Sequence, residues 1–284
     1  MKIYITSDST SDLSPEIRER FNIKTIPLFV SLGEKNFVDG VDIVPEDIYD
    51  YYNKTGKLPK TASTNIGEFA EFFRSIWDED TAIIHFAVSS EMSSSFNNAK
   101  IAAQEFSNIY VIDSRNLSTG IGLLMISAAN MANDGMKPEE IVEKLNDIIP
   151  RVDSSFVLDN LEYLHKGGRC SAVAMLGANL LKLKPCIEVK NGKMDVGKKY
   201  RGKFGDVLKT YAKERLLDAG DIEQDFIFVT HAGCNMDDVM AVVDEVKKIA
   251  PFKEVFLTRA ASTISSHCGQ YTLGVLFIRK NPVA

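Results

Sequence analysis

The chain has 284 residues, the size at which one domain begins to divide into two. With 45% hydrophobic and 25% charged residues, its composition is that of an ordinary globular protein. A formal net charge of −6 at pH 7 argues against binding along a nucleic-acid backbone, because such binding requires a basic face.

Strands and helices alternate through the first half of the chain. Pro15 follows a capping serine at a helix start, and Pro27 places the strand 23–32 at an edge or a bulge. Repeated β-α-β units predict an α/β domain with a doubly wound parallel sheet. The expected strands are 3–6, 23–32, 81–88 and 109–112. The expected helices are one that begins at Ser14, then 45–53, 66–77, 93–106, a long one from about 118, and one that follows Pro138 and ends at Pro150.

The second half has a different pattern. Asn191-Gly192 lies between two apolar runs and predicts a β-hairpin. Expected strands are 155–158, 184–189, 193–199, 225–230, 255–258 and 273–278, with helices around 161–164, over 203–219 and between 230 and 255. The change predicts a boundary near 150. Residues 1–150 then form the parallel-sheet domain, and 151–284 form a second α/β domain with a mixed or antiparallel sheet, whose last strand is also compatible with a return to the first domain.

The sequence also predicts a compartment. Residues 1–5 run directly into a strand, so we expect no cleavable signal sequence. The longest apolar stretch, 120–132, contains Ser127 and Asn130 and is shorter than the roughly 20 residues of a membrane-spanning helix. Four scattered cysteines without a C-x-x-C pair favour reduced thiols, and no Cys/His spacing indicates a metal. We therefore expect a cytoplasmic protein without a transmembrane segment, metal or cofactor.

Three hydroxyl-rich turns adjoin apolar runs, at 60–65, 89–95 and 262–269. Hydroxyls and backbone N–H groups at strand-to-helix turns can hold an anion without a full counter-charge. A single histidine among them, His267, favours a carboxylate that is held reversibly rather than hydrolysed. The pattern is more typical of a carrier than of a catalyst.

The chain resembles the DegV family of bacterial fatty-acid-binding proteins. The resemblance runs nearly end to end, and the order and spacing of the motifs carry it. The motifs are Ser7–Leu13, Lys60–Thr64, Ser89-Ser90 with Ser93–Ser95, Val111–Ser114, Leu161–Arg169, and His267–Gly269 leading to Leu273–Phe277. It implies two α/β domains with a long-chain fatty acid bound between them and no catalytic activity. It also implies that the protein carries the acyl chain for a separate fatty acid kinase, which phosphorylates the carboxylate for phospholipid metabolism.

Carried over by position, the resemblance implies that Thr61 and Ser93 bind the carboxylate, with His267 nearby, the Ser94 amide assisting and Arg169 as a further ligand-binding residue. The family usually has Thr-Ser-Gln-Pro at 61–64, Ser-Gly-Thr at 93–95 and Gly-Pro-Gly after the histidine, so this chain departs there. Its preference among acyl chains is left open.

Other interpretations of these residues remain. Thr61 and the serines 93–95 are also candidate helix caps. Ser93 as nucleophile with His267 as base would make an esterase or hydrolase, but no G-x-S-x-G elbow or orienting Asp is evident. A carrier of another lipid or small acid is a further alternative. The acidic cluster Asp8, Asp12, Asp39 and Asp42 is interpreted as turn and cap residues rather than as a ligand site.

Two further features concern the tail and the partner. The apolar segments 121–126 and 172–181 suit an acyl tunnel, although core helices are the ordinary interpretation of such segments. Lys198, Lys199 and Arg201 belong to the densest basic run of an acidic chain. A solvated hairpin end is the default, and docking to an acidic surface of the kinase is the functional hypothesis.

Overall fold

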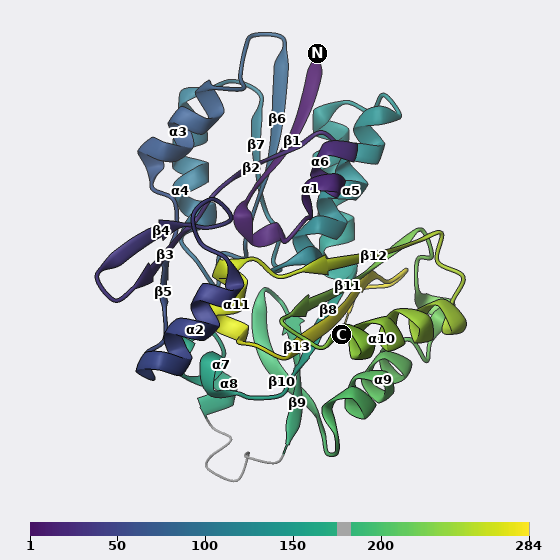
Figure 1. Ribbon diagram of the computed structural model, residues 1–284. Helices are drawn as coiled ribbons and strands as arrows, with labels where there is room; N and C mark the ends of the chain where they lie inside the picture. The colour runs from purple at the N-terminus through teal and green to yellow at the C-terminus, as the bar shows by residue number, and fades with distance from the viewer. Residues whose placement is uncertain (175–182, 284) are drawn as a thin grey trace.

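A parallel sheet and a mixed sheet form the framework of the computed structural model, which describes residues 1–174 and 183–283 (Figure 1). The α/β class and both sheet types match the sequence-based prediction. Nothing tests the proposed domain boundary at residue 150, which stays a prediction.

The parallel sheet has the strand order β2-β1-β6-β7. Its strands are β1 (Lys2–Asp8), β2 (Ile23–Ile26), β6 (Thr81–Ala87) and β7 (Ile109–Asp113). Within β6, Ile83 packs toward α3 (Ile66–Arg74) and α4 (Ser95–Ala102), whereas Ile84 packs toward the opposite face. That face is covered by α1 (Pro15–Arg20), α5 (Thr119–Asn133) and α6 (Pro138–Ile148). Helices on both faces make the sheet doubly wound, as predicted.

The mixed sheet has the order β10-β9-β8-β13-β11-β12. Its strands are β8 (Val152–Leu158), β9 (Lys184–Lys190), β10 (Lys193–Tyr200), β11 (Phe226–Ala232), β12 (Glu254–Arg259) and β13 (Thr272–Ile278). Asn191 and Gly192 join β9 to β10 with φ of 51° and 80°, which confirms the predicted hairpin. The last strand, β13, pairs with β8 and β11, so its expected alternative return to the first sheet is wrong.

Helix α5 lies between the two sheets and contacts strands of both. It is buried over most of its length, and Ile121, Leu123 and Leu124 are fully enclosed. The outer face of the mixed sheet is covered by α9 (Phe204–Arg215) and α10 (Met236–Ile249), as Figure 1 shows. The helix predicted over 203–219 is shorter in the structure, where α9 ends at Arg215. No helix in the described ranges is long and apolar enough to cross a bilayer.

The prediction of one continuous strand over 23–32 is wrong. The segment divides at Pro27 into β2, which is an edge strand of the parallel sheet as expected, and β3 (Phe29–Leu32). Proline has no N–H for a ladder, and the Pro27 carbonyl instead accepts a hydrogen bond from Thr64 Oγ1 at 2.7 Å. The chain thereby leaves the first sheet, and β3 pairs with β4 (Lys35–Val38) and β5 (Lys60–Ala62).

The prediction of a turn at 262–269 is also wrong, because residues Ser262–Cys268 form helix α11. The remaining helices are α2 (Pro45–Thr55), α7 (Glu162–Gly167) and α8 (Ser171–Ala174). In Figure 1, α11 lies at the centre of the molecule, close to α2 and α7. The predicted apolar segment 172–181 falls largely outside the described residues.

Candidate ligand-binding site

A pocket of about 350 Å³ opens among α11, the carboxyl edge of the parallel sheet and the inner face of the mixed sheet. The connection that follows β1 leads to β2, and the connection that follows β6 leads to β7 on the opposite side. The strand order therefore reverses between β1 and β6, and open α/β sheets bind ligands at such an edge. The wall is mainly apolar and includes Leu28, Val88, Met92, Phe156, Met194 and Leu276. No residue of 121–126 is among the described lining residues, so that segment is core rather than tunnel wall.

All five predicted site residues line this pocket: Thr61, Ser93, Ser94, Arg169 and His267. They come from β5, from the turn before α4, from the loop after α7 and from α11. Sequence-distant segments thus contribute to one polar group of side chains beside an apolar cavity.

Thr61 and His267 contact each other directly. Thr61 Oγ1 lies 2.8 Å from His267 Nε2, and this hydrogen bond joins β5 to the C-terminal end of α11. Thr61 reaches this position because β5 pairs with β3, the strand that Pro27 directs away from the parallel sheet. The contact holds both side chains at the pocket.

The other ring nitrogen of His267 is isolated. Its Nδ1 is buried, and no hydrogen-bond partner is found for it in 1–174 or 183–283. A Cβ at Gly167 would lie 3.0 Å from Nδ1, so the backbone of α7 approaches the ring closely. Burial, followed by the positive charge of Arg169, lowers the pKa of His267 to about 4. The imidazole is therefore neutral at physiological pH.

The first two hydroxyl-rich turns also meet. Ser63 Oγ and Ser94 Oγ lie 2.6 Å apart, and the Asn98 side-chain amide donates to Ser63 Oγ at 3.3 Å. Ser93 Oγ accepts from the Ser95 amide at 3.2 Å, which is the local turn role expected at a helix start. Its position at the pocket is compatible with that role. Sequence analysis did not identify Ser63 as a pocket residue or Asn98 as its hydrogen-bond donor, because only tertiary contacts bring them together.

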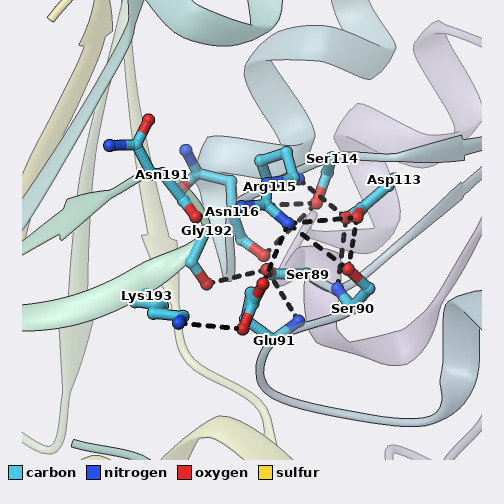
Figure 2. A network of polar contacts seen from close by, with 10 residues as sticks. All are labelled: Ser89, Ser90, Glu91, Asp113, Ser114, Arg115, Asn116, Asn191, Gly192 and Lys193. Carbon is cyan, nitrogen blue, oxygen red and sulfur yellow. Dashed lines mark hydrogen bonds and ion pairs between the residues drawn. The ribbon is translucent and has the colours of Figure 1, made fainter.

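A polar network fixes the turn that leads to Ser93 (Figure 2). The Ser90 amide and hydroxyl donate to the two carboxylate oxygens of Asp113, at 3.1 and 2.5 Å. Ser89 Oγ donates to the Gly192 carbonyl at 2.7 Å, and Arg115 donates to the Asn191 carbonyl. The β9–β10 hairpin is thereby fastened to the carboxyl edge of the parallel sheet.

The acidic residues Asp8, Asp12, Asp39 and Asp42 make the hydrogen bonds of caps and turns, as predicted, and all but Asp42 are buried. Asp8 accepts hydrogen bonds from the amides of Thr10 and Val88, and Asp42 accepts from the Val38 amide. Asp12 accepts from the Ala261 amide at 2.8 Å. Asp39 accepts from the Ser262 amide at 2.9 Å. No group of His, Cys, Asp and Glu in the described part of the chain is arranged to hold a metal ion.

A nucleophile–base arrangement is not visible in this geometry. His267 Nε2 bonds Thr61 rather than a serine of the 93–95 turn, and no carboxylate orients Nδ1 within the described residues. Burial raises the pKa of the Cys268 thiol to about 12, so this neighbour of His267 is not a thiolate at neutral pH.

The fold and the pocket define a class of α/β proteins. These proteins have a mainly apolar pocket between a parallel and a mixed sheet, with polar groups from strand-to-helix turns at one end. The family model "Uncharacterised protein, DegV family" matches residues 2–280. The chain belongs to the DegV family.

Curated relatives and solved structures agree with this. A DegV domain-containing protein of Caldanaerobacter subterraneus is 31% identical, over 98% of this chain and 99% of the relative. One from Staphylococcus aureus is 32% identical with the same coverage. A fatty-acid-binding DegV protein from Thermus thermophilus superposes with a TM-score of 0.87 at 28% identity, covering 98% of this chain and 100% of the other. A stearic-acid-binding protein from Eubacterium ventriosum gives 0.86 at 28%, with 99% of each chain covered.

Proposed function

We propose that this protein binds a long-chain fatty acid and presents its carboxylate to a separate fatty acid kinase, without catalysing a reaction itself. The acyl tail occupies the pocket between the two sheets, and the carboxylate lies at Thr61, Ser93, Ser94, His267 and Arg169. The observation that carries the proposal is one pocket of about 350 Å³ that combines a mainly apolar wall with these polar groups.

The apolar wall supplies the affinity in this proposal. Each methylene transferred from water to an apolar site contributes about 0.8 kcal/mol, so a sixteen-carbon tail gains on the order of 10 kcal/mol before the costs of association. The similar proteins from Thermus thermophilus and Eubacterium ventriosum, described as binding a fatty acid and stearic acid, support this ligand class.

The polar end then needs only to orient the head group. Thr61 and the serines offer neutral donors, and the neutral His267 ring can exchange its hydrogen bond with Thr61 for one with a carboxylate. Arg169 is the one charged side chain among the described lining residues, and it lies on the exposed side. A carboxylate held mainly by neutral groups remains accessible to chemistry performed by a partner.

The hydrolase alternative receives less support. Ser93 is engaged in its own turn, and the histidine lacks an orienting carboxylate in the described ranges. If a chromogenic ester is turned over and Ser93→Ala abolishes the turnover, the protein is an enzyme and the carrier proposal is wrong. A carrier of another lipid or small acid differs only in what the pocket retains.

The ligand is identified by native mass spectrometry of freshly purified protein, before and after extraction with organic solvent. A mass increment equal to a long-chain fatty acid, lost on extraction, is the expected result. A Thr61→Val, His267→Gln double variant is expected to carry less of it. If the copurified mass is not that of a long-chain fatty acid, the protein carries another class of ligand and the fatty acid proposal is wrong.

The kinase is proposed to dock at the basic run Lys198, Lys199 and Arg201, at the end of β10 and just after it. Lys198 already pairs with Glu214 at 2.6 Å, whereas no ion pair is found for Lys199 or Arg201 in the described residues. Arg201→Glu is expected to weaken kinase association and leave fatty acid retention unchanged, because such patches act mainly on encounter. Lys247→Glu, on the exposed face of α10, is the matched control. Loss of ligand together with association in Arg201→Glu would contradict the docking role.

Two proposals accompany this function. The division into domains 1–150 and 151–284 would place the ligand between them, and a cytoplasmic location would bring the carrier together with a kinase that serves phospholipid metabolism.

A further inference from the structure

Helix α11 carries His267, but the side chains that cap its N-terminus come from other parts of the chain. It has seven residues, begins after Ala261, and receives no hydrogen bond from the side chain at its N-cap. Isolated helices of this length are unstable in water, since nucleation costs more than a few hydrogen bonds return. Its position must therefore be determined by contacts from elsewhere in the chain.

Helix α11 packs against α2 and α7, and the Tyr49 hydroxyl donates to Ser265 Oγ. At its N-terminus, two further contacts come from carboxylates of the first 40 residues. Asp12 accepts from the Ala261 amide at 2.8 Å and Asp39 accepts from the Ser262 amide at 2.9 Å. Both carboxylates are almost fully buried, at 4% and 3% exposure. Carboxylates at a helix N-terminus satisfy its unpaired N–H groups and interact favourably with its dipole.

Each carboxylate is in turn held by a serine of the first half. Ser118 Oγ donates to Asp12 at 2.5 Å, and Ser9 Oγ donates to Asp39 at 2.8 Å. Ser9 Oγ also accepts from the Leu28 amide at 3.1 Å. The N-terminus of α11 is thus attached to a rigid network at the carboxyl edge of the parallel sheet, and its C-terminal His267 meets Thr61.

We propose that Asp12 and Asp39 are positioning residues of the ligand site, which cap α11 from the first half of the chain and thereby hold His267 against Thr61. The proposal deepens the proposed function, because it concerns the residue assigned to the head group. Neither carboxylate touches the ligand in this proposal. They act through the helix.

Asp8 provides a matched comparison. It is fully buried near the same edge and accepts backbone hydrogen bonds from Thr10 and Val88, but it makes none to α11. A general loss of stability should therefore follow replacement of either type of carboxylate. Only Asp12 and Asp39 should affect the environment of His267.

The test compares Asp39→Ala, Asp39→Asn and Asp8→Asn in ligand-free protein, with the His267 ring signals followed by NMR against pH and assigned by their absence in His267→Gln. In the wild type, burial and the Arg169 charge place the pKa of His267 at about 4. Asp39→Ala is expected to raise it toward the ordinary value of 6.5 as the ring becomes solvated. Asp39→Asn keeps an oxygen acceptor for the Ser262 amide and is expected to restore most of the wild-type titration, and Asp8→Asn is expected to leave it unchanged.

Fatty acid affinity is measured in the same variants. Asp39→Ala is expected to bind at least about tenfold more weakly, with Asp8→Asn near the wild type. Where Asp39→Ala does not fold, Ala261→Pro replaces it: φ of −73° suits proline, and the substitution removes the amide that bonds Asp12. An unchanged His267 titration in a folded Asp39→Ala or Ala261→Pro variant overturns the proposal. Since the titration is measured without ligand, it is independent of whether the pocket holds a fatty acid.

Discussion

Thr61 Oγ1 and His267 Nε2 form a 2.8 Å hydrogen bond although 206 residues separate them in the chain. The bond joins a strand of the small antiparallel sheet to the end of α11 beside an apolar pocket. Each residue therefore keeps the other in place, and the carboxylate of the proposed ligand would compete for the same polar atoms.

Replacement of Thr61 tests the head-group role. Thr61→Val keeps the shape and removes the hydroxyl, and a hydrogen bond to a charged group contributes about 1.5–3 kcal/mol. Fatty acid affinity is therefore expected to fall by roughly 10- to 100-fold, measured by displacement of a fluorescent fatty acid. Thr210→Val is the control, because Thr210 lies on α9 and donates only to the Asp206 carbonyl. Equal affinity in both variants would exclude Thr61 from the site.

A series of saturated fatty acids of increasing length tests the role of the tail. If the apolar wall supplies the affinity, each added methylene contributes about 0.8 kcal/mol, or roughly a fourfold lower Kd, until the pocket is filled. Calorimetry or displacement at one pH measures this slope. In Thr61→Val, all acids are expected to bind more weakly, with the same gain in affinity per methylene as in the wild type. If affinity in the wild type does not change with chain length, the head group and not the tail supplies the binding energy.

The buried imidazole predicts a pH dependence of stability. The folded-state pKa of His267 is lowered to about 4 from 6.5. Between these values the unfolded state binds a proton that the folded state does not, so the free energy of unfolding decreases as pH falls, by about 1.4 kcal/mol per pH unit. His267→Gln removes this contribution, and the difference between variant and wild type in denaturant unfolding at pH 7, 6 and 5 isolates it.

Other groups do not alter that comparison. The lowered pKa of His85 acts in the same direction, and the raised pKa values of Asp8 and Asp12 act in the opposite direction. All are present in both proteins and cancel in the difference. A difference that is independent of pH between 7 and 5 would mean that His267 is solvated.

The hairpin turn predicts a separate stability effect. Gly192 has φ of +80°, and a Cβ there would lie 2.6 Å from Ser89 Oγ and 2.8 Å from the Arg115 guanidinium. Gly192→Ala thus combines a left-handed backbone with a steric clash. Gly135 has φ of +82° and open space around it, so Gly135→Ala measures the backbone cost alone, about 1–2 kcal/mol. In urea unfolding, Gly192→Ala is expected to lower the free energy of unfolding more than Gly135→Ala does. Equal losses would show that Ser89 and Arg115 move aside at little energetic cost.

The sequence by itself determined the elements whose signals are local. The Asn191-Gly192 hairpin follows from turn chemistry, and the burial of β6 on both faces follows from its continuous apolar run. The motif order along the chain was sufficient to indicate the family. Residues such as Thr61 and His267 were recognisable as candidates through that resemblance, with their contacts still unknown.

Only the tertiary structure decided how these residues meet. Pro27 was visible in the sequence, but the departure of β3 into a separate sheet, which delivers Thr61, depends on pairings with distant strands. Residues 262–268 looked like a turn because serines and threonine are weak helix formers. They form a helix that packs against α2 and α7, and its first amide hydrogens are accepted by Asp12 and Asp39, more than 220 residues away. Local propensity and periodicity extend over a few residues, whereas capping and pocket formation depend on contacts that exist only after the chain has folded.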